Sequence, residues 1–276
     1  MVPIAMRLFI FALLLSRAFA GLRAEDQSRP ATPQEIALFK VALQDSSQDT
    51  EHWAYTETTT QKFSKGEPKG DTIVRFDPSL PYPDQYKPLQ VEGRPPTEKN
   101  LKDYRKRGEK RGERVARAAE AARNPGFVPP PAQLRIAGTS VTPDLEHPRV
   151  ASEDEGHLVF EVPVQTTRSD IPVDKFQVLV TVGRPACLIE HVSFRVRESF
   201  HLKLIAKVRA GEATLDFSVV NPKFGPVLTD LAGDVSGSLL FVPLSAEFTR
   251  KRTEWKRVKS YDERFQVKLG PLQILD

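Results

Sequence analysis

The sequence has a single cysteine among 276 residues, Cys187. It cannot form an internal disulfide, and no Cys-x-x-Cys pair is present to hold zinc. We expect Cys187 to be a small buried hydrophobic residue; a reactive thiol is the alternative. Long apolar runs are also scarce, since none after the first residues approaches the roughly 20 residues of a membrane-spanning helix. The sequence therefore predicts neither a disulfide framework nor a transmembrane helix.

Histidine is sparse too, with 5 residues, and no two have the HxH or HxxxH spacing typical of metal ligands. Glycine-rich phosphate loops and the GxSxG motif of serine hydrolases are absent. The nearest resemblance to a nucleophile motif is Gly233–Gly237, which contains Ser236 and which we interpret as a β-turn before a strand at Ser238. We expect no metal, no cofactor and no enzymatic activity. A hydrolase without a recognisable motif is the third alternative, and it requires His191 or His201 beside a serine and a carboxylate.

The longest apolar run lies near the start of the chain. Leu8–Leu15 follows Arg7, and Ala18-Phe19-Ala20 supplies small residues for cleavage. This pattern is typical of a secretory signal peptide over 1–20, with a weaker cleavage position after Ala24. We therefore expect a periplasmic or secreted protein.

Positive charge is concentrated in one segment. The whole chain carries +4, whereas 98–123 has ten basic and five acidic residues, a net +5. Helix start and stop signals predict a basic surface helix over 97–123, followed by a proline-rich tether over 124–131. A solvated helix is the simpler interpretation; contact with an anionic surface or an acidic protein partner is the alternative. The interleaved acidic residues argue against nucleic acid.

A short amphipathic helix is predicted over 32–44. Thr32 is a candidate N-cap, Pro33 suits the first helical position, and Glu35 completes a capping box. The apolar positions then recur with helical spacing at Ile36, Phe39 and Leu43. Because no other element is so strongly amphipathic, we expect this helix to cover an apolar sheet face.

Most of the chain shows the period-two alternation of half-buried β-strands. The alternation dominates 188–205, where Glu198 is the exception and the apolar positions are Val192, Phe194, Val196, Phe200, Leu202 and Leu204. Other strands are expected at His52–Phe63, Asp71–Phe76, Leu89–Val91, Leu158–Val164, Phe176–Val182, Ala213–Val219 and Leu240–Phe248. Turns are expected at 183–185 and 209–212, which favours an antiparallel meander.

The predicted fold is mainly β with helices, an α+β class. We expect a curved antiparallel sheet or half-barrel, covered by the N-terminal helix, with one long basic surface helix. A single β-rich domain would span 32–276, with a helical insertion at 97–123 and the tether at 124–131.

Three segments carry a family resemblance: Arg75–Ser79, Leu89–Thr97 and Leu101–Arg105. They resemble a run found in exported bacterial proteins of unknown function. With the first helix and the sheet after it, the layout over most of 32–276 is similar to that of periplasmic lipoprotein carriers. The resemblance implies a bent antiparallel half-barrel, closed over helices around an apolar cavity for acyl chains.

Two main functions follow from these patterns. The first is a non-enzymatic binding or chaperone-like protein, whose apolar or acyl-chain ligand contacts Phe194, Val196, Phe200, Leu202 and Phe217; a plain packed core is the simpler interpretation of these residues. The second is an envelope interaction or scaffold protein that uses the basic helix 97–123. A void of several hundred cubic ångströms between the sheet and its covering helix favours the carrier, and tight filling favours the scaffold.

Overall fold

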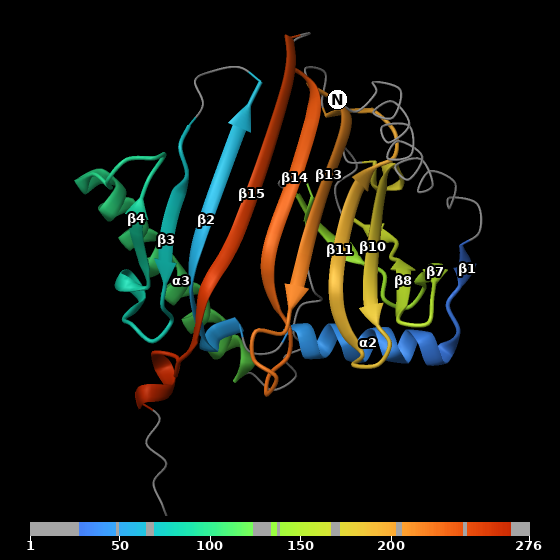
Figure 1. The fold of residues 1–276 in the computed structure, drawn as a ribbon, viewed down its shortest axis with the longest axis horizontal. Coiled ribbons are helices and arrows are strands. Elements are labelled where there is room, and N and C mark those ends of the chain that lie inside the picture. The colour runs from blue at the N-terminus through green and yellow to red at the C-terminus, as the bar shows by residue number, and fades with distance from the viewer. Residues whose placement is uncertain are drawn as a thin grey trace, which may run out of the picture.

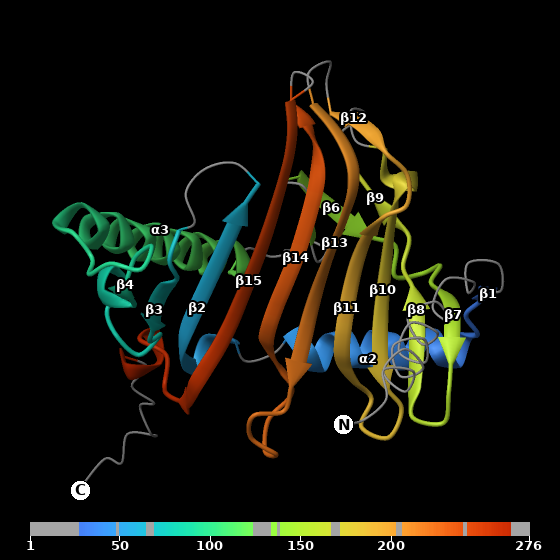
Figure 2. The same cartoon turned by 45° about the horizontal axis from the view of Figure 1, so that its top comes forward.

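The computed structural model describes residues 28–47, 50–64, 69–123, 134–136, 139–166, 172–202, 206–239 and 242–265. Within these residues the protein is mainly antiparallel β-structure, with a 12-stranded sheet, a second sheet of 3 strands and two α-helices (Figures 1 and 2). The predicted signal peptide and the tether at 124–131 lie outside the described residues. No α-helix in the described ranges is long and apolar enough to cross a membrane.

The strands differ widely in length. The long ones are β2 (Trp53–Phe63), β10 (Phe176–Gly183), β11 (Leu188–Val196), β13 (Ala206–Ser218), β14 (Val227–Leu239) and β15 (Val242–Arg257). The short ones are β1 (Arg29–Pro30), β3 (Thr72–Phe76), β4 (Tyr86–Gln90), β5 (Leu134–Ile136), β6 (Thr139–Pro143), β7 (Arg149–Glu153), β8 (His157–Glu161), β9 (Val164–Gln165) and β12 (Phe200–Leu202). The helices are α2 (Pro33–Ser47) and α3 (Glu98–Ala122), and 3-10 turns lie at η1 (Thr50–His52), η2 (Tyr82–Asp84), η3 (Val173–Lys175) and η4 (Asp262–Phe265).

The large sheet has the strand order β1-β7-β8-β10-β11-β13-β14-β15-β2-β3-β4, with β12 paired to β13. Its two edges, β1 and β4, do not meet, so the sheet is not closed into a barrel. The last long strand, β15, pairs antiparallel with the first, β2, so that Phe63 lies opposite Ala246. This pairing joins the N-terminal hairpin β2–β3 to the C-terminal meander.

Several predicted boundaries were wrong. The alternation over 188–205 is divided between β11 and β12, and Glu198, which pairs with Lys175 at 2.5 Å, lies between them. The turn predicted at 209–212 lies inside β13, where a bulge between Val208 and Ala210 takes up the irregularity. The turn predicted over 233–237 lies inside β14, because glycine in a long strand resembles a turn signal when cross-strand partners are unknown.

Two further predictions need correction. The strand predicted over 158–164 ends at Glu161, although Val162 and Val164 are still buried. Cys187 is only half-buried, at the end of the turn before β11. Its φ of 51° lies in the left-handed region, so it is a turn residue and not part of the core.

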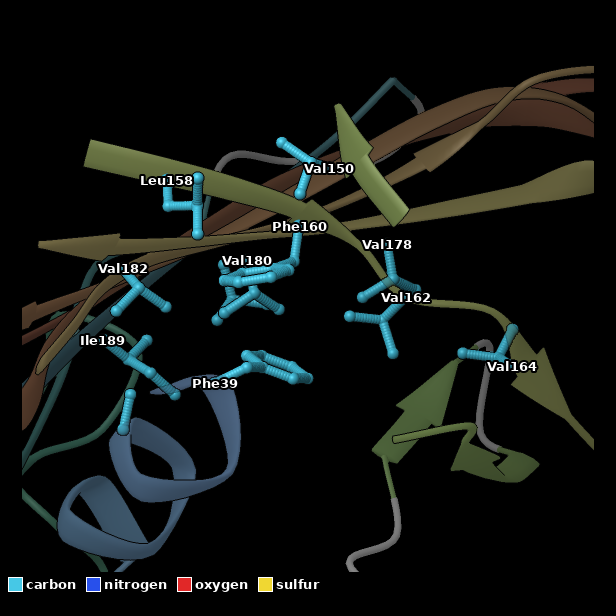
Figure 3. Close-up of a cluster of buried hydrophobic side chains, with 12 residues drawn as sticks. Phe39, Val150, Leu158, Phe160, Val162, Val164, Val178, Val180, Val182 and Ile189 are labelled. Carbon is cyan, nitrogen blue, oxygen red and sulfur yellow. The ribbon is translucent and has the colours of Figure 1, made fainter. Parts of the chain in front are cut away.

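The helix α2 covers one half of the sheet on the face that we call the inner face. Phe39 is 1% exposed, and its ring centroid lies 4.8 Å from that of Phe160. Around this pair pack Ala42, Val150, Leu158, Val162, Val164, Val178, Val180, Val182, Ile189 and Val192 (Figure 3). Each such side chain contributes about 1.5 to 3 kcal/mol when fully buried. This half is a packed aliphatic core.

A capping box and an ion pair fix the start of α2. Thr32 donates its backbone N–H to Glu35 at 2.7 Å, and Glu35 donates its own to Thr32 Oγ1 at 3.3 Å. The Arg29 guanidinium binds the same carboxylate at 2.6 and 2.9 Å. These contacts lower the pKa of Glu35 to about 2, with the Arg29 hydrogen bond as the main cause.

The helix α3 lies against β4 and η2, at the opposite end of the sheet (Figure 1). Gly108 is at the closest approach, since a Cβ there would lie 1.9 Å from the carbonyl oxygen of Tyr82. Arg111, only 7% exposed, donates to Gln85 Oε1 at 2.6 Å and forms an ion pair with Glu51. One face of this basic helix is therefore docked, and the opposite face is in solvent.

The Glu35 contacts generate a pH prediction. Because the folded pKa of Glu35, about 2, is below its ordinary value of 4.5, its stabilising contribution is complete above 4.5 and is lost as the pH falls toward 2. The Glu35→Gln variant keeps the capping geometry but lacks the charge. Its melting temperature should lie below that of the wild type at about pH 7, and the two curves should converge toward about pH 3. A gap of constant size would contradict this assignment, and Glu120→Gln, at an exposed position on α3, is the control.

Candidate functional site

Three rows of side chains run across the inner face, perpendicular to the strands. The strand register shows which residues lie next to each other in each row. Val196 is placed beside Gly211 because a Cβ built on that glycine would lie 3.6 Å from Val196 Cγ2. The first row is Val196, Gly211, Val235, Ala246 and Phe63. The second is Phe200, Val208, Gly237 and Leu244. The third is Phe194, Ala213, Gly233, Phe248 and Gln61.

The middle of these rows is apolar and accessible. Its large side chains are exposed by 41 to 55%: Phe63, Val235, Val242 and Leu244. Together with the half-buried Ala246 and Phe248 they form what we call the central strip. It lies on β14, β15 and the end of β2, in the middle of the strand order and toward the strand ends that are farther from α2 (Figure 2).

Three glycines lie on the inner face within the rows. Gly211, Gly233 and Gly237 occupy one inner-face position in each row. The ring of Phe248 fills the space over Gly233, where a Cβ would lie 2.7 Å from its Cζ. Glycine inside a strand permits close approach of a ring, a backbone or a ligand. At these positions the glycines allow close approach of the Phe248 ring and of neighbouring backbone.

A polar cavity of about 230 Å³ adjoins the strip on the same face. It lies between β2, β3 and α3, and its lining includes Glu57, Thr59, Gln61, Lys69, Thr72, Glu92, Tyr104, Arg107 and Arg250. Gln61 belongs both to this lining and to the third row, opposite Phe248. An apolar surface and a charged cavity are therefore continuous.

Glu57 is the central carboxylate of the cavity wall. Its side chain is 11% exposed, and it accepts a hydrogen bond from Arg252 Nε at 3.0 Å. Arg250 Nε lies 3.5 Å away, on the other carboxylate oxygen. The two arginines neighbour each other on one face of β15, so Glu57 screens their mutual repulsion.

Stacked arginines hold this half of the inner face together. Arg107 lies 4.3 Å from the ring centroid of Tyr86, and Arg252 lies 4.7 Å from that of Tyr55. Burial raises the pKa of the Tyr55 hydroxyl, and it does the same for the pKa of Tyr104. Such cation–π contacts contribute about 0.5 to 2 kcal/mol each. Guanidinium groups can therefore remain within an aromatic layer.

The structure places the predicted ligand residues in different surroundings. Phe194 and Phe217 pack against the core under α2, and Phe200, 5% exposed, has its ring centroid 5.1 Å from that of Phe176. Val196 lies at the border of the central strip. Leu202 is the last residue of β12, and its side chain lies outside the described residues. Phe194, Val196 and Phe200 thus begin the three rows, but they do not form the accessible part.

The sequence did not predict that the accessible residues form a site. It predicted Leu244 and Ala246 as residues on one face of a strand. Their exposure could not be predicted, because alternation shows which face a side chain is on but not whether another element covers that face. No sequence pattern links Arg107 with Arg250, because they are far apart in the chain. They line the same cavity only because α3 and β15 are neighbours in the folded structure.

The outer face carries charge and no recognisable catalytic set in the described residues. Glu212, Asp234 and Glu247 lie side by side on three strands. Among the described residues, no group of three or more histidine, cysteine or acidic side chains is placed to hold a metal ion. His191 contacts Asp216 at 2.6 Å, and no hydrogen bond joins a serine to His191 in the same part of the chain. Ser236 lies in the middle of β14.

Comparisons with family models, curated proteins and solved structures find no match to this chain.

We predict that Glu57→Gln destabilises the protein by about 1 to 3 kcal/mol, because it leaves two neighbouring arginines on one face without their carboxylate. Urea unfolding gives the free energy of unfolding. The matched control is Glu92→Gln, which removes an exposed pair with Lys69 at 2.6 Å and should cost under about 1 kcal/mol. Equal effects of the two substitutions would show that the Glu57 cluster has no special importance.

Proposed function

We propose that this protein is a non-enzymatic binding or chaperone-like protein that holds the apolar chain of a ligand on the central strip. The observation that carries the proposal is that Phe63, Val235, Val242 and Leu244 share one sheet face with Ala246 and are 41 to 55% exposed. Contiguous exposed apolar surface marks binding sites more often than scattered single residues do.

A long unbranched chain suits the strip better than a compact apolar molecule. Each methylene group that leaves water contributes about 0.8 kcal/mol. Association costs about 4 kcal/mol or more in lost freedom, so only a ligand with many buried methylenes binds well. From Leu244 to Arg250 the strand β15 extends about 20 Å. An acyl chain lying along the strands satisfies both conditions.

The layout supports the same proposal in part. The sheet is open, and both helices lie on its inner face (Figure 1). A half-barrel carrier of the periplasmic lipoprotein-carrier type resembles this arrangement, and export through the signal pattern at 1–20 is part of the proposal. Such a carrier encloses a cavity beneath its helices, whereas the space under α2 is filled by the aliphatic core, which favours the scaffold alternative. In this proposal the ligand therefore lies beside that core, on the strip.

The test is the double variant Val235→Ser/Leu244→Ser. We expect it to weaken binding of a fluorescent fatty acid by about 10-fold or more, since two apolar contacts are lost. Its unfolding free energy should change by less than about 1 kcal/mol, because both side chains are largely exposed. Leu89→Ser, 47% exposed on β4, is the matched control and should bind normally. If the wild type neither binds the probe nor retains lipid in native mass spectrometry, the proposal is wrong.

A second candidate function rests on the solvent face of α3. Lys102, Lys106, Lys110 and Arg114 are exposed and follow one another at i,i+4 spacing. Like charges at this spacing cost about 0.2 to 0.5 kcal/mol per pair, so the stripe does not stabilise the helix. Attraction to an anionic surface or an acidic partner offsets that cost. This is the envelope interaction or scaffold alternative.

Charge reversal tests this second function without removing the docked helix. Lys106→Glu/Lys110→Glu should abolish flotation with vesicles that contain anionic lipid, and salt should have the same effect on the wild type. Lys223→Glu/Lys259→Glu makes the same charge change at exposed positions elsewhere. If both pairs behave alike, net charge alone explains any binding, and α3 has no specific role in it.

A further inference from the structure

The central strip leads into the charged cavity. On β15 the inner-face positions run from Leu244 through Ala246 and Phe248 to Arg250. On β2 they run from Phe63 through Gln61 to Thr59, and the last two line the cavity. A chain that lies along these strands therefore has one end at the cavity.

The cavity has more positive than negative charge. Its lining holds Lys69, Arg107 and Arg250 against Glu57 and Glu92. Lys69 and Glu92 neutralise each other at 2.6 Å, and Glu57 binds Arg252 more closely than Arg250, at 3.0 against 3.5 Å. Arg107 stacks on Tyr86 and makes no ion pair in the described part of the chain. The positive charges of Arg107 and Arg250 are therefore only partly neutralised by the carboxylates around the cavity.

Arg250 is only loosely paired. Its Nε is buried and lies 3.5 Å from Glu57 Oε1, but it makes no hydrogen bond of good geometry to any residue that the structure describes. The guanidinium is therefore not saturated by Glu57. The side chain as a whole is 40% exposed and lines the cavity, so an acceptor in the cavity can reach the guanidinium.

The size of the cavity limits what it can hold. About 230 Å³ is less than the roughly 300 to 1,000 Å³ of sites that enclose a complete ligand. A small headgroup fits, and a large polar molecule does not. Planar guanidinium groups bind carboxylate and phosphate oxygens in preference to neutral groups.

We propose that this cavity binds the anionic headgroup, a carboxylate or phosphate, of the ligand whose apolar chain lies on the central strip. Arg107 and Arg250 supply the donors, and the ligand class is an anionic single-chain amphiphile. The inference depends on the proposed function and adds the chemistry of the polar end.

The experiment compares dodecanoic acid with dodecanol, which have the same chain and differ in charge. The wild type should bind the acid about 10-fold more tightly than the alcohol, the factor expected for charge-assisted hydrogen bonds. Arg107→Gln and Arg250→Gln should each reduce this preference and leave alcohol binding unchanged. Glu57 keeps Arg252 as a partner in Arg250→Gln, which favours folding of that variant. Arg105→Gln, exposed on α3, is the control and should behave as the wild type.

Each outcome decides the inference. Equal binding of acid and alcohol by the wild type overturns it and leaves the proposed function intact, and no variant is needed for that comparison. Binding of neither compound removes the proposed function and the inference with it. If acetate or inorganic phosphate occupies the cavity as tightly as the acid does, the cavity is a site for free anions, and the inference is wrong. Loss of preference in both arginine variants, with normal alcohol binding, supports it.

Discussion

The need to cover one wide apolar sheet face determines this architecture. In the described part of the chain, α2 covers the β8–β11 region and α3 lies at the β4 edge, so each helix reaches only one end of the face (Figure 2). Burying apolar surface stabilises the fold by about 25 cal/mol for each Å², and an exposed sheet face lacks this stabilisation. The central strip is the part of the face that remains exposed. Exposed apolar patches of this kind mark interaction sites, ligand grooves or aggregation liabilities.

The two covered halves use different chemistry. Under α2 the contacts are aliphatic, around Phe39 and Phe160. Near α3 they are aromatic and cationic, with Arg107 on Tyr86 and Arg252 on Tyr55. Arginine tolerates such a layer because its guanidinium is flat and weakly hydrated. The consequence is a gradient across one face, from a covered apolar core through the accessible strip to a positively charged cavity.

Local patterns predicted the parts of the fold that local physics determines. The capping box at Thr32 and Glu35, the alternation over β10 and the hairpin β2–β3 could be read from neighbouring residues. The continuity of β13 and β14 could not, because Gly211 and Gly237 resemble turn residues until their cross-strand partners are known. The same limit applies to the candidate site. Its apolar residues were assigned to strands, but their exposure and their proximity to Arg107 depend on tertiary structure.

The pairing of β2 with β15 has a consequence for how the molecule assembles. Contacts between distant parts of a chain form slowly, because closing a long loop costs entropy before any contact offsets it. The meander from β7 to β14 can form from sequential neighbours, whereas the β2–β4 hairpins and α3 join the sheet only through β15. The central strip and the cavity both lie across the pairing of β2 with β15. Neither surface exists until these two strands have paired, so a chain that lacks this contact presents neither.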